Sequence, residues 1–519
     1  MSREPESVNR WLITLAVMVP TLIEILDTSV ANVALKHIQG SLAAGEEEVT
    51  WVLTSYLVAN AIVIPMSGWL ARLMGRKRFL MLSIAVFTAS SLLCGAATTL
   101  PQIILFRIFQ GLGGGGLQPM SQAILMETFP PQQRGMAMGI FGVGVVLGPI
   151  LGPLMGGYLT DNFTWRWIFY INLPVGLLAL YLAGAFLFDP PYMERRQRGE
   201  VVDYLGLALL TTGIGALQIV LDKGQQDDWF SSPFITTLAV VSAVSLVGLV
   251  FWELRHPRPV LDFRILKNRS FAIGNVVMFF GFFAFFGSIV LLPLFLQGLM
   301  GYTAYLAGLV LGPGGMLALV FMPVAGKLTE RIDARWMLAF GMLVCAYSLH
   351  IMAGFNLYID FGTAAFARVL QGIAMPFFFV SLSVVTFAYV PREAMNTASP
   401  LYNLLRNLGG SFGVAFVTTL LARRTQYHHS VLAEDMTPLS AAYQLGYEQI
   451  RAGLAMQLGE VADLAERAQT LIYQMLQREA SALAFNDAFM SQGAIFLVLF
   501  FCVWFMRRPP RGKHEGFVE

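Results

Sequence analysis

Two carboxylates and an arginine stand inside long apolar segments of this sequence. Glu24 and Asp27 are three positions apart in the first segment, so they share one face if that segment is helical. Two carboxylates in hydrocarbon do not both ionise easily, because burial and mutual repulsion disfavour the second charge. Such a pair can take up and release a proton, with Arg107 as the permanent counter-charge. The alternative is that Asp27 only caps or pairs, or that both acids lie near the wet end of the segment.

The surroundings of Arg107 are repeated later in the chain. The pentad Arg-Ile-Phe-Gln-Gly at 107–111 returns as Arg-Val-Leu-Gln-Gly at 368–372, 261 positions later. An arginine in hydrocarbon costs several kcal/mol, so a chain with one at the same point of two segments uses it or holds it with a partner. Gln110 and Gln371 belong to the two pentads and join the candidate site.

The two halves differ in their acids. Shorter matches, such as Pro65 with Pro323, recur at an offset of 258, and the residue 258 positions after Asp27 is Phe285. Arg368 therefore lacks an acidic match in its own half. For Arg368 and for Arg406, a role in substrate binding or gating competes with a structural role, in which they bond backbone carbonyls or lie near a span end.

Small residues follow a regular spacing in the fifth apolar segment. Glycines recur every four residues, with Pro149 between them and Gly157 beside the last one: Gly144, Gly148, Gly152 and Gly156. Such a stripe lets a neighbouring helix approach closely. We expect it to form a seam that seals one face of the cavity and lets the halves rock.

Composition sets the class of protein. Of 519 residues, 56% are hydrophobic and only 13% charged, which leaves too little polar surface for a water-soluble globule. No basic tract suggests nucleic acid, and the glycine run 113–116 lacks the Lys and Ser/Thr of a phosphate-binding loop. We expect no cofactor, no metal site at His428 and His429, and no enzyme, since no nucleophile, base and orienting group can be assembled. The energy source is then an ion gradient.

Apolar runs of about 20 residues predict fourteen transmembrane helices. They lie near 11–34, 49–70, 79–98, 101–126, 136–159, 167–188, 204–222, 234–252, 271–295, 303–325, 336–355, 362–389, 398–421 and 489–506. With a cytoplasmic N-terminus, the inside segments hold 23 Lys and Arg and the short outside loops hold three. This bias predicts that both termini are cytoplasmic.

The repeats divide the chain into two homologous six-helix halves. The predicted parts are a first half at 1–190, an inserted two-helix hairpin with basic linkers at 191–269, a second half at 270–506 and a tail at 507–519. Parallel repeats of this kind are typical of transporters. The stretch 423–488 is rich in Ala, Leu and Gln, and we expect a helical hairpin in the periplasm.

Several motifs resemble one family. Leu26-Asp27-Thr28-Ser29 with Ala31-Asn32-Val33 looks like the first-helix motif of the fourteen-helix drug:proton antiporters of the major facilitator superfamily, and of the EmrB-type exporters among them. The pentad at 107–111 is similar to their fourth-helix motif, and Gly148-Pro149 through Gly156-Gly157 to the antiporter motif. Trp165 to Phe169, with Ile171-Asn172, resembles a signature at the sixth helix. One departure is Arg72, where the superfamily usually carries an acid in the loop before Gly75-Arg76-Lys77.

The resemblance implies a function and partners. It implies export of hydrophobic, often amphipathic compounds in exchange for protons by alternating access, with Asn32 among the candidate substrate or gating residues. EmrB-type pumps of the bacterial inner membrane work with a periplasmic adaptor (EmrA-type) and an outer-membrane channel (TolC-type), and 423–488 is the expected docking element. The alternatives are an exporter of one metabolite, such as a fatty acid or siderophore, and a non-transporting sensor or scaffold with a transporter fold.

Overall fold

All regular secondary structure in the described part of the chain is helical. The computed structural model describes residues 9–189, 203–257, 259–434, 436–437, 440–458 and 463–508, with every side chain in them except those of Glu46, Pro149, Ile150, Pro153, Ala304 and Ala442. These ranges contain helices and no strand. An α-helix satisfies its own backbone polar groups, which hydrocarbon cannot do. The predicted all-α membrane class is confirmed.

The first half crosses the bundle six times. Four crossings are built mainly by one helix each: α1 (Arg10–Ser41), α3 (Trp51–Met74, preceded by the short α2, Glu46–Val49), α4 (Arg76–Ala96) and α7 (Arg134–Asn162). The other two are pairs: α5 (Leu100–Gly114) with α6 (Leu117–Thr128), and α8 (Trp167–Tyr170) with α9 (Asn172–Phe186).

The glycine run at the α5–α6 junction is a packing surface. A Cβ on Gly113 would stand 2.5 Å from the backbone nitrogen of Phe87 in α4. A Cβ on Gly115 would stand 2.6 Å from the carbonyl oxygen of Asn60 in α3. Only glycine permits this approach, so the run brings α3 and α4 close to the fourth crossing.

The inserted hairpin touches both halves. Helices α10 (Tyr204–Lys223) and α11 (Pro233–Arg255) pack on each other, and α10 also packs on α3 and α16. Ser411 of α16 donates to Gln218 of α10 (3.2 Å), and Trp229 donates to Thr419 (3.0 Å). Of the predicted insert, residues 191–202 and 258 lie outside the described ranges.

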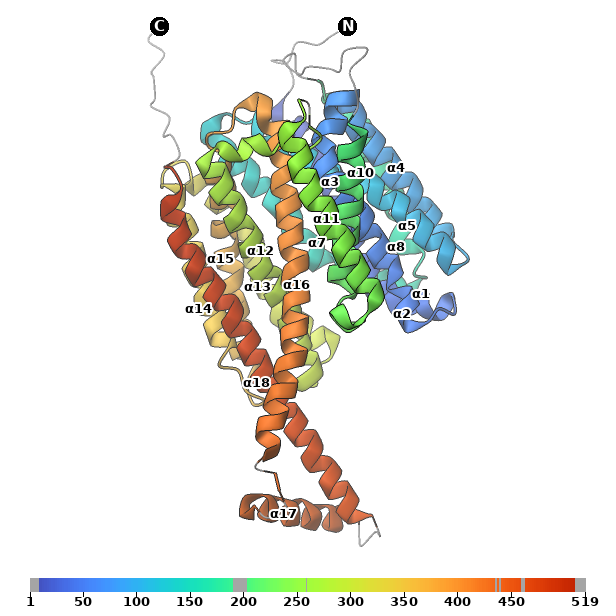
Figure 1. Cartoon of the computed structure of the whole chain (residues 1–519), viewed down its shortest axis with the longest axis vertical. Helices are drawn as coiled ribbons and strands as arrows, with labels where there is room; N and C mark the ends of the chain where they lie inside the picture. The colour runs from blue at the N-terminus through green and yellow to red at the C-terminus, as the bar shows by residue number, and fades with distance from the viewer. Residues whose placement is uncertain are drawn as a thin grey trace.

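The helices of the second half are α12 (Arg269–Leu294), α13 (Ala304–Leu328), α14 (Ala334–Met352), α15 (Phe361–Phe387), α16 (Met395–Glu434), α17 (Ala441–Leu458) and α18 (Leu464–Cys502). The last three of them form a long extension. At 40 residues, α16 is about 60 Å long, so it exceeds the hydrocarbon thickness about twofold. Figure 1 shows α16 and α18 leaving the bundle together, with α17 near their far ends, while α1 begins and α18 ends at the opposite end of the bundle.

Each of the fourteen expected spans falls on one helix or on a pair of consecutive helices. In the described chain, twelve helices are long and apolar enough to cross a membrane. The remaining two expected spans are the α5–α6 pair and α7, so the count of fourteen is consistent with the fold and stays a prediction. The domain bounds also stay predictions, and 509–519 of the tail lie outside the described residues.

Candidate functional site

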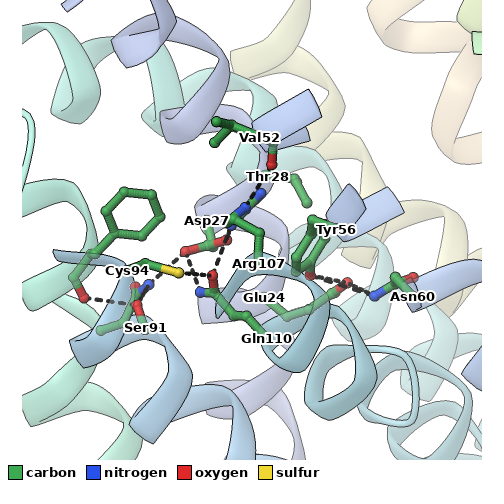
Figure 2. A network of polar contacts seen from close by, with 12 residues as sticks. Glu24, Asp27, Thr28, Val52, Tyr56, Asn60, Ser91, Cys94, Arg107 and Gln110 are labelled. Carbon is green, nitrogen blue, oxygen red and sulfur yellow. Dashed lines mark hydrogen bonds and ion pairs between the residues drawn. The ribbon is translucent and has the colours of Figure 1, made fainter. Parts of the chain in front are cut away.

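Asp27 and Arg107 form a buried ion pair between α1 and α5. Nη1 of Arg107 lies 2.5 Å from Oδ2 of Asp27, and the two side chains are 0% and 1% exposed. The guanidinium also donates from Nε to the carbonyl of Val52 (3.0 Å) and from Nη1 to Oε1 of Gln110 (2.9 Å). It lies 4.2 Å from the ring centroid of Tyr56. Figure 2 shows these groups converging on Arg107.

The second carboxylate oxygen of Asp27 is held by two amides. Oδ1 accepts from Nε2 of Gln110 (2.8 Å) and from Nδ2 of Asn172 in α9 (2.7 Å). Asn172 also donates to Ser91 of α4, whose hydroxyl donates to the carbonyl of Phe169. Asp27 therefore ties α1 to α5 and α9. Asn172 was not among the predicted site residues, although it stands in the sixth-helix signature.

Glu24 belongs to a separate network on the same helix. Its carboxylate accepts from Tyr56 Oη (3.2 Å), Asn60 Nδ2 (3.1 Å) and Gln118 Nε2 (2.5 Å). Glu24 is 2% exposed. Tyr56 touches both networks, since its hydroxyl donates to Glu24 and its ring faces Arg107. The two acids of α1 thus have different partners, and nothing in the spacing alone indicated Tyr56, Asn60 or Gln118.

Gln118 extends the Glu24 network into the other half. Its Oε1 accepts from Nη2 of Arg406 on α16, and the Arg406 guanidinium lies 5.9 Å from the ring centroid of Phe282. Further contacts between the halves run toward the end at which α1 begins. They are Asn403 with Gln122, Ser399 with the Pro119 carbonyl, and Arg134 with the Phe387 carbonyl.

Arg368 and Gln371 lie apart from this network, in the second half. Arg368 donates from Nη1 to Oε1 of Gln371, and Gln371 donates to Oγ of Ser288 (2.7 Å). Asn32 is exposed and belongs to none of the networks described above.

The glycine stripe of α7 faces α1 of its own half. Cβ atoms on Gly144, Gly148, Gly152 and Gly156 would stand 2.2 to 3.2 Å from atoms of Met18, Ile25, Ser29 and Val30. One on Gly157 would meet nothing within 4 Å. Pro149 lies in α7, and its side chain is outside the described part. The contact of α7 with α13 of the other half uses glycines not singled out from the sequence, Gly135, Gly139 and Gly142. A seam role for the stripe in transport stays a prediction.

Comparisons with known proteins place the chain in a family. The family model described as Major Facilitator Superfamily matches residues 17–414. The chain belongs to the major facilitator superfamily. A crystal structure of the human organic anion transporter MFSD10 shares the superfamily fold with a TM-score of 0.61 and 14% identity, covering 96% of this chain and 100% of that one.

Two relatives match this chain over nearly its whole length. The multidrug export protein EmrB of Escherichia coli (strain K12) is 37% identical over 512 residues, covering 98% of each chain. The fatty acid resistance protein FarB of Neisseria gonorrhoeae is 35% identical over 509 residues, covering 97% of each. The resemblance to EmrB-type exporters is thereby confirmed. Members of the superfamily are transporters, which agrees with the absence of an enzyme motif in the sequence.

In the segment that follows α3, basic and backbone groups bind two acids from other parts of the first half. Arg76 makes a bidentate pair with Glu127 at the end of α6, at 2.8 and 2.9 Å. The backbone nitrogen of Lys77 donates to Asp189 (2.9 Å), beside Gly75, whose φ of 88° favours glycine. Arg72 stands where the superfamily usually has an acid, but two acids distant in sequence, Glu127 and Asp189, bind the neighbouring residues Arg76 and Lys77.

Proposed function

We propose that this chain is a proton-coupled exporter of hydrophobic and amphipathic compounds, working by alternating access and conferring drug resistance. The observation that carries the proposal is the buried Asp27–Arg107 pair. An ionisable residue inside a membrane is costly and marks a functional site. The names of the EmrB and FarB relatives support export of toxic compounds. The proton gradient supplies the energy, and no cofactor is needed.

Protonation of Asp27 changes which helices hold together. The neutral acid loses its charge attraction to Arg107, while Arg107 keeps its bonds to Val52 and Gln110 and its contact with Tyr56. The cation stays on the α3–α5 side, and the tie between α1 and α5 weakens to the neutral hydrogen bond from Gln110 to Asp27. Losing one partner of a buried pair costs about 3 to 5 kcal/mol, enough to shift a conformational equilibrium.

The contacts between the halves support alternating access. Those of Gln118, Gln122 and Arg134 run from mid-bundle to the end where α1 begins. We assign this end to the cytoplasm, because of the 23-to-three bias in Lys and Arg. The chain then lies in the bacterial inner membrane with its cytoplasmic side closed and both termini cytoplasmic.

The extension formed by α16, α17 and α18 then stands in the periplasm. Arg424 of α16 and Asp487 of α18 pair at 2.5 Å, and His428 reaches the same carboxylate at 2.7 Å, which stiffens the base of the extension. We infer that it docks an EmrA-type adaptor, which joins a TolC-type channel. Deleting 440–475 should abolish adaptor pull-down and leave vesicle transport intact. Retained pull-down would refute the docking role.

The test of proton coupling uses everted vesicles energised with an acidic lumen. Lipophilic dyes and weak acids are added, and proton release is compared between the native protein, Asp27→Asn and the control Asp161→Asn at an exposed carboxylate. Release by several compounds that only Asp27→Asn abolishes supports the proposal. A response to one compound alone favours a dedicated exporter, an alternative that the name of the FarB relative supports. Ligand binding without flux favours the sensor or scaffold.

A further inference from the structure

The second half repeats the arrangement of Asp27, Arg107 and Gln110, with Ser288 in the place of Asp27. Gln110 donates to Asp27 at 2.8 Å, and Gln371 donates to Ser288 at 2.7 Å, each across 83 positions. Ser288 follows Asp27 by 261 positions, the same offset as the two pentads. The contacts therefore make Ser288 on α12 the structural counterpart of Asp27, three positions after Phe285, the match given by the offset of 258.

The change leaves Arg368 without a counter-ion. In the part of the chain that the structure describes, Arg368 has no carboxylate partner, and its buried Nε has no hydrogen-bond acceptor. The Nε of Arg107, by contrast, donates to Val52, and Asp27 compensates its charge. Arg368 is also partly accessible, whereas Arg107 is 0% exposed. An uncompensated guanidinium inside a bundle is costly unless something else supplies the negative charge.

We propose that Arg368 binds the carboxylate of an amphipathic monocarboxylate substrate, with Gln371 and Ser288 orienting the guanidinium. This inference rests on the proposed export function and names a substrate class for it. A guanidinium presents parallel donors that match a carboxylate, which favours it over a neutral or cationic head group. Arg107 does not offer such a site in this structure, because Asp27 is already paired with it.

The surroundings of Ser288 suit the apolar part of such a molecule. Phe285 and Phe286 lie within one turn of it on α12, and their rings pack on each other and on Phe282. Phe286 remains 39% exposed. An anionic head at Arg368 and an apolar tail along α12 would satisfy both features.

The test compares three probes with one tail and different heads: octanoate, octan-1-ol and octylammonium. Equilibrium dialysis measures their binding to the full-length protein in phosphatidylcholine nanodiscs, which contain no competing anionic lipid. The variants are Arg368→Gln, Ser288→Asp, which restores the acid of the first half, and Arg451→Gln, a matched change on exposed α17. We expect Arg368→Gln and Ser288→Asp each to weaken octanoate binding at least about tenfold, as the loss of a charged hydrogen-bond partner does. Arg451→Gln should leave it unchanged.

Other outcomes overturn the inference. They are no octanoate binding by the native protein, equal loss of octanoate and octylammonium in Arg368→Gln, or undiminished octanoate binding in Ser288→Asp. Proton release from everted vesicles with the native protein is measured in parallel with all three probes and a dye panel. If protons are released but octanoate binding does not depend on Arg368, the anion site alone is refuted. Arg368-dependent binding with no proton release by any compound refutes the export function instead.

Discussion

Glu24 and Arg406 lie in different halves of the bundle and are joined by one side chain, Gln118. The amide donates from Nε2 to Glu24 at 2.5 Å and accepts from Arg406 at Oε1. An amide has one donor end and one acceptor end, so its orientation is set by the carboxylate on one side and the guanidinium on the other. A change at the Glu24 carboxyl group on α1 would therefore reach α16, across the boundary that opens in the transport cycle proposed above.

Removing this amide should favour opening at the end where α1 begins. Gln118→Met keeps the volume but loses both hydrogen bonds, so we expect the contact between the halves to weaken by about 1 to 3 kcal/mol. Spin labels at Arg78 and Glu330, exposed near this end on the two halves, report the change as a larger population of long distances. Gln457→Met on α17 is the control. An unchanged distance distribution in Gln118→Met would contradict a closing role for the link.

The Asp27–Arg107 pair should show asymmetric energetics. Asp27→Leu leaves the permanent charge of Arg107 unpaired inside the bundle, and we expect the free energy of unfolding to fall by about 3 to 5 kcal/mol. Arg107→Met should cost less, because Asp27 can take up a proton and become neutral. The double variant should be more stable than Asp27→Leu alone, although transport is lost in all three. Thermal unfolding in detergent and vesicle flux measure the two properties, and additive losses of stability would argue against a coupled pair.

Two glycines of α7 form a matched test of the stripe. A Cβ on Gly152 would stand 2.3 Å from Cβ of Ser29 in α1, while one on Gly157 would meet nothing within 4 Å. Gly152→Ala should destabilise the protein by about 1 to 3 kcal/mol through overpacking. Gly157→Ala should be neutral or stabilise by up to about 1 kcal/mol, the gain in helix propensity. Equal effects on the melting temperature would show that α1 does not approach α7 as closely as the structure has it.

The loss of stability on acidification should depend on Asp333, in the loop before α14. Burial raises the pKa of its carboxyl, but the hydrogen bonds and charge of Arg335, with the charge of Arg508, outweigh burial and hold the pKa below its ordinary value. A lowered folded-state pKa stabilises the protein above the unfolded-state value, about 3.9, and the contribution disappears as pH falls through the folded-state pKa. Asp333→Asn should therefore lower the melting temperature at pH 7, and this difference should shrink below about pH 4. A difference that is independent of pH would exclude a charge effect.

Composition and periodicity were sufficient for the class of fold. Hydrocarbon accepts only segments whose backbone is internally bonded, so long apolar runs had to be helices, and each predicted span does fall on helix. The repeated pentad also selected Arg107, because a charge in an apolar run is conspicuous in sequence. The pairing of Asp27 with Arg107 follows from the same property, since a buried charge requires a partner.

Only the tertiary structure decided which neutral groups complete the sites. Asn172, Tyr56 and Gln118 reach the carboxylates from helices far away in sequence, and an amide or a phenol in a helix is not conspicuous as a charge is. The same holds for Ser288, whose match to Asp27 depends on the register of α12 against α15. Helix register is set by the packing of many side chains at once. The repeats offered two offsets, 258 and 261, which match Asp27 to Phe285 and to Ser288, and only the contact of Ser288 with Gln371 decided between them.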